Sequence, residues 1–311
     1  MDTLLNAVIP IFGLMLAGFV VGRLGVLGAG ASTPLNRFVF YCALPALLFR
    51  AVALAPLGDV LRWDFILVFT VGIALIAGLA LIGSALLFKD GLRPAMMRAV
   101  NTSYGNVGYL GIPLAAVAFG EKGVVAAGVT IVLNTVLILT PATAVFELTA
   151  RRGANEGRAV GSALRSIATN PLILAVILGL AVSAGGAGLA SPLDAILKLL
   201  GNAAGPCALF ALGLYISGRP FVRLYGRLAF GMTLKLVVFP LLVWGLVLWV
   251  LPLEPMWRAL AVLMAGTPIG AGSFVLAERY GIDADETSTA IVVSTVLSIV
   301  TLGVLLVRFS A

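Results

Sequence analysis

Long apolar segments, separated by short polar loops, run through the whole chain. Each is about 20 residues or longer, which is the length an α-helix needs to cross the hydrocarbon core of a bilayer. With Pro, Gly and charged residues taken as boundaries, the pattern predicts ten spans, at 3–22, 36–56, 64–88, 94–119, 122–149, 164–185, 192–217, 224–251, 256–280 and 286–308. The expected fold class is therefore an all-α polytopic membrane protein.

An internal repeat is visible at an offset of about 161 residues. The matched positions are Pro10 and Pro171, Gly18 and Gly179, Pro45 and Pro206, Pro94 and Pro255, Gly105 and Gly266, and Gly111 and Gly272. Each half holds five predicted spans. Because five is an odd number, the second copy enters the membrane from the opposite side and is inverted relative to the first. We therefore predict a first repeat at 1–150, a cytoplasmic linker at 151–162, and a second, inverted repeat at 163–311.

Composition supports the membrane assignment and charge gives it a direction. The chain is 61% hydrophobic and only 11% charged, with a mean hydropathy of +1.14, whereas soluble domains are about a quarter charged. Loops on one side of the membrane carry 13 Lys and Arg residues, and loops on the other side carry 6. The side with 13 is predicted to be cytoplasmic, and both termini are predicted to lie outside. We expect the protein in the inner (plasma) membrane. The net charge of +7 therefore reflects loop residues, and we expect no nucleic-acid partner.

Two predicted spans, one in each half, contain residues that interrupt helices. The first holds Asn101, Tyr104, Gly105, Asn106, Gly108, Gly111 and Pro113, and the second holds Gly266, Thr267, Pro268, Gly270 and Ser273. Proline removes a backbone donor and glycine permits unwound backbone, and interruptions at matched positions point to a transporter binding site. The glycines also fit a simple helix-packing face, which would not need the polar side chains.

The two interruptions would direct two half-helix N-termini toward the membrane midplane, where they favour an anion. Asn106 and Thr267 could add side-chain donors. Lys235 lies about 11 residues into its span and has no acidic residue at similar depth. A buried lysine of this kind suggests a contact with an anionic substrate, or a long side chain that extends to the membrane surface.

The absence of acidic residues in mid-span argues against sodium/proton exchange. Four matched polar residues, Asn134, Thr135, Ser294 and Thr295, could contact an ion or form ordinary interhelical hydrogen bonds. The chain has no histidine. We predict no catalytic residue, no metal site and no cofactor.

At Gly105–Pro113, Lys235–Pro240 and Gly266–Pro268 the chain resembles the auxin efflux carrier family, which includes plant auxin exporters and bacterial permeases for malate or malonate. The resemblance runs over essentially the whole chain. It implies two inverted five-helix repeats with broken, crossing helices 4 and 9, a scaffold of helices 1, 2, 6 and 7, and a transport unit of helices 3–5 and 8–10. It also implies homodimers and an elevator-type motion that carries small organic anions. The loop between predicted spans 5 and 6 is only about 15 residues long, so the chain resembles the short bacterial form.

The leading hypothesis is a secondary transporter of small carboxylates such as malate or malonate, or of auxin-like weak acids, with the bilayer and the anion as its partners. A sodium-coupled symporter of larger amphipathic anions, of the bile-acid type, is the alternative. An intramembrane enzyme that uses Ser273 is a remote third, because a serine nucleophile needs an adjacent base. The residues leave open the substrate, the coupling ion and the direction of flux.

Overall fold

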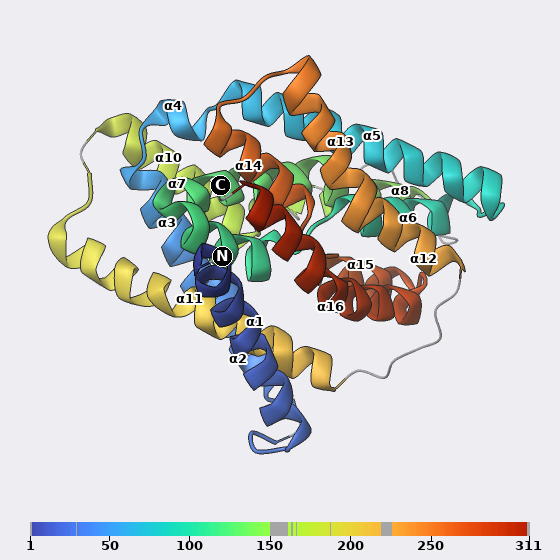
Figure 1. Cartoon of the computed structure of the whole chain (residues 1–311), viewed down its shortest axis with the longest axis horizontal. Coiled ribbons are helices and arrows are strands. Elements are labelled where there is room, and N and C mark those ends of the chain that lie inside the picture. The colour runs from blue at the N-terminus through green and yellow to red at the C-terminus, as the bar shows by residue number, and fades with distance from the viewer. Residues whose placement is uncertain are drawn as a thin grey trace.

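Helices make up the folded part of the chain, as the computed structural model shows (Figure 1). It describes residues 2–28, 30–149, 161–162, 164–165, 167–186, 188–218 and 226–309. Within these ranges six helices are long and apolar enough to cross a membrane, and three shorter apolar helices accompany them. The protein is thus an all-helical polytopic membrane protein, while the number of ten spans stays a prediction.

The first half contains α1 (Asp2–Arg23), α2 (Ser32–Phe38), η1 (Val39–Ala43), α3 (Leu44–Leu54), α4 (Leu57–Val60), α5 (Trp63–Leu87), α6 (Leu92–Ser103), η2 (Val107–Gly111), α7 (Ile112–Asn134), η3 (Thr135–Leu139) and α8 (Thr140–Leu148). The second half contains α10 (Pro171–Gly185), α11 (Ser191–Ser217), α12 (Gly226–Thr233), η4 (Leu234–Val238), α13 (Phe239–Gly245), η5 (Leu246–Val250), α14 (Pro255–Ala265), α15 (Gly272–Tyr280) and α16 (Ala284–Phe309). The predicted linker at 151–162 and the predicted span start at 224 lie largely outside the described residues.

Four wide helical turns of the π type, η1 to η4, each come directly before a Leu-Pro, Ile-Pro, Thr-Pro or Phe-Pro pair. The prolines are Pro45, Pro113, Pro141 and Pro240. A proline has no N–H, and its ring clashes with the carbonyl four residues earlier. A turn with one extra residue moves that carbonyl away, so the helix continues with a π-bulge instead of ending.

The long helical stretch at 107–148 folds back on itself at Gly120. A straight helix of its 42 residues would be about 63 Å long, roughly twice the apolar thickness of a bilayer. Gly120 has φ 62° and ψ −147°, a backbone conformation that only glycine adopts readily. A Cβ on Gly123 would overlap the carbonyl of Ala115, which places the two sides of the turn in contact.

Two pairs of helices pack with unusually close backbones. A Cβ on Gly18 of α1 would overlap the carbonyl of Phe210 in α11, and a Cβ on Gly179 of α10 would lie 3.0 Å from the carbonyl oxygen of Phe49 in α3. Small residues let membrane helices approach in this way. These two contacts are reciprocal under the repeat, because Gly179 matches Gly18 and Phe210 matches Phe49.

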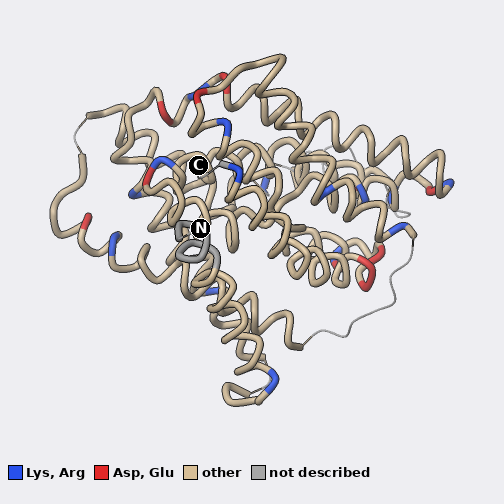
Figure 2. Tube along the Cα trace, viewed as in Figure 1, with Lys and Arg blue, Asp and Glu red and all other residues tan. Residues whose placement is uncertain are grey.

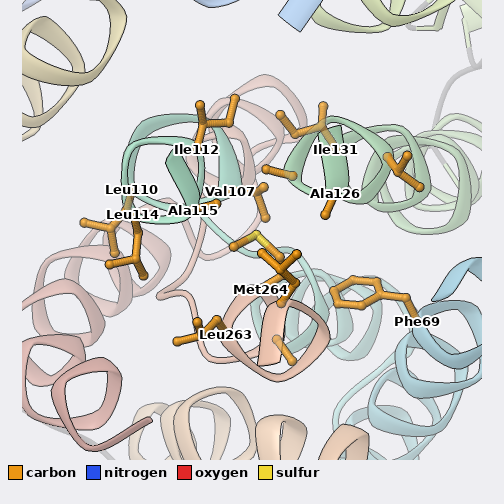
Figure 3. Close-up of a cluster of buried hydrophobic side chains, with 14 of the residues drawn as sticks. Phe69, Val107, Leu110, Ile112, Leu114, Ala115, Ala126, Ile131, Leu263 and Met264 are labelled. Atoms are coloured by element: carbon orange, nitrogen blue, oxygen red, sulfur yellow. The ribbon is translucent and has the colours of Figure 1, made fainter. Parts of the chain in front are cut away.

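The largest buried cluster contains residues of most of the described helices, among them α5, α7 and α14. Figure 3 shows the Met264 side chain of α14 between Val107 and Phe69, with Ala126 nearby. Charged residues lie mostly toward helix ends, and the trace between them is largely uncharged (Figure 2). One ionic cluster is buried, where Arg98 contacts Asp90 at 2.7 Å and Glu286 at 3.2 Å.

Candidate functional site

The two interruptions that the sequence predicts meet in space. The chain leaves α6 after Ser103 and resumes as η2 at Val107, and it leaves α14 after Ala265 and resumes as α15 at Gly272. Between them, Gly105 and Ile269 form an antiparallel bridge. Asn106 N–H donates to the carbonyl oxygen of Pro268 at 2.7 Å, and Gly270 N–H donates to that of Tyr104 at 3.0 Å. The backbone N–H and C=O groups that lose their helical partners at the two interruptions therefore hydrogen-bond to each other within the protein.

Glycine is required where the two segments touch. A Cβ on Gly105 would overlap the Thr267 hydroxyl oxygen and lie 3.3 Å from Lys235 Nζ. A Cβ on Gly270 would overlap the Tyr104 ring. We refer to residues 104–106 and 266–271 together as the crossover.

Lys235 contacts the crossover on the side away from the cavity described below. Its side chain is fully buried, so it does not extend to a membrane surface. Nζ donates a 2.8 Å hydrogen bond to the carbonyl oxygen of Ala265, the last residue of α14, and lies 4.7 Å from the centre of the Phe239 ring. A cation at the C-terminal end of a helix satisfies free carbonyls and complements the helix dipole.

A cavity of about 650 Å³ opens in front of the crossover. Five predicted site residues line it, namely Tyr104, Gly105, Asn106, Gly108 and Gly270, together with Asn134 and Thr135. It extends to helix ends that carry Arg37, Asn170 and Arg279, and we call that side the mouth face. The opposite helix ends, which carry Arg50, Arg62 and Glu254, form the far face. None of the cavity's described lining residues is acidic.

Donors for an anion converge on this cavity. Asn106 precedes the first turn of η2, and its carbonyl accepts from Leu110 and Gly111. The N–H groups of the residues just after it therefore have no helical partner. Gly270, Ala271 and Gly272 bring the start of α15 to the same cavity. Asn106 is 3% exposed and its Nδ2 has no hydrogen-bond partner in the described structure. The arrangement brings two helix N-termini to the cavity, where they favour a carboxylate, with the buried, unpartnered amide of Asn106 beside them.

The other predicted site residues lie outside the lining of this cavity. Thr267 donates to Met264 O at 2.7 Å, and Asn101 donates to Thr287 at 3.1 Å. The Ser294 hydroxyl accepts a hydrogen bond from Ile269 N–H at 3.2 Å and so holds the segment 266–271 of the crossover in place. The Thr295 hydroxyl donates to the carbonyl oxygen of Ile291 in its own helix. Gly266, Pro268 and Ser273 are buried behind the cavity, and Pro113 lines a smaller pocket.

This chain matches the family described as "Membrane transport protein" over residues 3–306. The chain belongs to the auxin efflux carrier family. Members of this family are transporters and not enzymes, so the enzyme hypothesis built on Ser273 is excluded.

Named relatives of this auxin efflux carrier family protein agree with a transport function. A protein of Rhizobium meliloti named "Putative malonate transporter" is 33% identical over 310 residues, which cover 98% of this chain and 96% of that protein. An "Uncharacterized transporter" of Methanothermobacter thermautotrophicus is 29% identical over 96% of this chain and 95% of its own. The "Uncharacterized transporter YfdV" of Escherichia coli is 26% identical over 94% of this chain and 93% of its own.

Several cavity residues of this family member were not expected from its sequence. They include Asn36, Arg37, Tyr109, Thr143, Asn170 and Arg279. Arg37 and Arg279 lie near predicted span ends, where charges ordinarily mark the membrane boundary. Tyr109 follows the interruption, and its hydroxyl donates to Asn36 O at 3.3 Å. Only the packing of α2, α8, α10 and α15 around η2 brings these residues to one cavity. Among the described residues, no group of His, Cys, Asp and Glu could hold a metal ion.

Proposed function

We propose that this protein is a secondary active transporter of small organic anions, with carboxylates of the malonate and malate type as its substrates. The observation that carries the proposal is the convergence of two helix N-termini and the free Asn106 amide on one cavity without acidic lining. Helix N-termini attract anions, and a low-dielectric surrounding strengthens that attraction. The malonate assignment is drawn from the name of the Rhizobium relative.

We also propose that the chain is built as two inverted five-helix repeats. The reciprocal contacts Gly18–Phe210 and Gly179–Phe49 support this, since a two-fold axis exchanges one contact for the other. In this architecture α1, α2–α3, α10 and α11 form the scaffold, and the remaining helices form the transport unit. The crossover belongs wholly to the transport unit, so an elevator-type motion would carry the bound anion past the scaffold.

In this proposal the structure is the state with its site open to the cytoplasm. The mouth face carries the ends of the predicted spans that the Lys and Arg distribution assigns to the cytoplasm. Exposed Arg37 at the mouth would raise the local concentration of anions, whereas Arg279 is already paired with Glu147 at 3.3 Å. We expect the protein in the inner (plasma) membrane with both termini outside.

The test is uptake of labelled malonate and malate into proteoliposomes, with imposed pH, sodium or voltage gradients. Each charge moved across 100 mV corresponds to about 2.3 kcal/mol, so the gradient that drives uptake identifies the coupling. Asn106→Ala should raise KM or abolish uptake while folded yield stays normal. Thr301→Ala is the matched control, because Thr301 Oγ1 is likewise buried without a partner in the described structure but lines neither pocket.

Full activity of Asn106→Ala would refute the crossover as the binding site. An absence of malonate and malate uptake under every gradient would refute the small-carboxylate substrate. Cholate and indole-acetate are included as further substrates, and uptake of cholate with sodium would favour the amphipathic-anion alternative.

A further inference from the structure

An ion-pair cluster joins three helices on the far face. Arg50 of α3 contacts Asp194 of α11 at 2.7 Å and Glu121 of α7 at 2.8 Å. Only 15% of the Arg50 side chain is exposed. Arg50 and Asp194 lie in the proposed scaffold, whereas Glu121 follows Gly120 at the tip of the proposed transport unit. One arginine thus holds an acid from each of the two bodies.

The cluster lies outward of a second, smaller pocket. This pocket has a volume of about 260 Å³ and is lined by Leu47 and Gly201 of the scaffold and by Val117 of the transport unit. Arg50 lies one helical turn beyond Leu47, Glu121 lies four residues beyond Val117, and Asp194 lies about two turns before Gly201, nearer the start of α11. All three charged residues are therefore on the same side of the pocket. On the far face their ion pairs link the two bodies.

We propose that Arg50, Glu121 and Asp194 form the far-face gate of the transporter. The inference rests on the proposed function, since it needs a scaffold and a unit that moves against it. When the transport unit moves, Glu121 separates from Arg50 and opens the small pocket to the far face. Asp194 stays with Arg50 in both states, because the two share the scaffold.

The two acids have opposite effects on the equilibrium between states. A partly buried arginine is unstable without a counter-charge. Glu121 pairs with Arg50 only in the mouth-open state, so it favours that state. Asp194 keeps Arg50 paired after Glu121 has left, so it makes the far-open state accessible. Glu121→Gln should therefore shift the protein toward the far-open state, and Asp194→Asn should shift it toward the mouth-open state.

Cysteine labelling measures this shift without any substrate. The chain has only two cysteines, Cys42 and Cys207, and replacing both with Ala gives a cysteine-free background. Leu139→Cys then places a single thiol in the cavity on the transport unit. A membrane-impermeant maleimide is added to right-side-out and to inside-out vesicles, and labelling is followed over time.

We expect Glu121→Gln to slow mouth-face labelling and accelerate far-face labelling by on the order of two- to five-fold, the range for a partly exposed ion pair. Asp194→Asn should do the reverse. Glu254→Gln is the matched control, because it breaks the far-face pair with Arg62, at 2.9 Å, within the proposed transport unit. Its labelling ratio should equal that of the parent.

Equal labelling ratios in all four proteins, or shifts in the same direction for both gate variants, would overturn the gate. A shift of similar size in Glu254→Gln would also overturn it, because any far-face charge would then have the same effect. Since labelling needs no transported anion, the gate can stand even if the small-carboxylate substrate fails.

Discussion

Gly105→Ala tests whether the crossover needs close backbone contact. The new methyl group would overlap the hydroxyl oxygen of Thr267 and lie 3.3 Å from Lys235 Nζ. Overpacking of this kind costs about 1–3 kcal/mol. If the strands separate instead, the bonds Asn106 N–Pro268 O and Gly270 N–Tyr104 O are lost, at about 0.5–1.5 kcal/mol each.

The expected loss of about 2 kcal/mol lowers the ratio of intact to separated crossover by on the order of 30-fold. The assay has two parts, malonate uptake in proteoliposomes and the midpoint of thermal unfolding in detergent. We expect Gly105→Ala to lower both. Gly13→Ala is the matched control, because a Cβ there has no neighbour within 4 Å, and it should lower neither.

A second substitution shows whether the overlap is the cause. Thr267→Ala removes the overlapping hydroxyl and leaves the Thr267 Cβ at 3.5 Å from the new methyl, so that the 3.3 Å approach of the flexible Lys235 side chain is the one tight contact left. Gly105→Ala combined with Thr267→Ala should therefore be more stable than Gly105→Ala alone. Wild-type stability and uptake in Gly105→Ala, or no recovery in the double variant, would refute the reasoning.

Two further variants test the groups that support the fold around the site. Lys235→Met should lower the midpoint of thermal unfolding, because the buried carbonyl of Ala265 loses its donor at a cost of about 1–3 kcal/mol. The KM of the folded protein for the anion should not change. A raised KM would instead show that Lys235 contacts the anion. Asp90→Asn should destabilise the protein by about 3 kcal/mol, because Arg98 and Asp90 are both almost fully buried. The midpoint of thermal unfolding checks this, with Glu147→Gln at the more exposed pair with Arg279 as control; equal losses in both would contradict it.

Much of the fold could be predicted because the bilayer restricts the solutions. A span needs about 20 apolar residues and an internally bonded backbone, so hydropathy suffices to locate the long apolar helices. The interruptions at Tyr104–Asn106 and at 266–271 followed from Gly and Pro in mid-span. The π-bulges before Pro45, Pro113, Pro141 and Pro240 were not predicted. A proline pattern indicates disturbed helix, but whether the helix ends or widens depends on its neighbours.

The site was harder to predict than the fold. Asn106, Gly108 and Gly270 line the cavity, while Thr267, Lys235 and Ser294 support the crossover from behind. All six are polar residues or glycines in apolar segments, and sequence alone does not distinguish those that face a cavity from those that hold its wall. The direction of each side chain depends on the rotation of its helix, which neighbouring helices determine.

Sequence by itself determined that this chain is an all-helical membrane protein with two interrupted helices at repeated positions. Those properties depend on local composition and on the free-energy cost of backbone N–H and C=O groups that have no hydrogen-bond partner in lipid. Only the tertiary structure decided that the two interruptions bond to each other, that Lys235 binds the end of α14, and that Arg50 joins acids from α7 and α11. Such contacts link residues 30 to 164 positions apart, and they form only when helices have packed around one another.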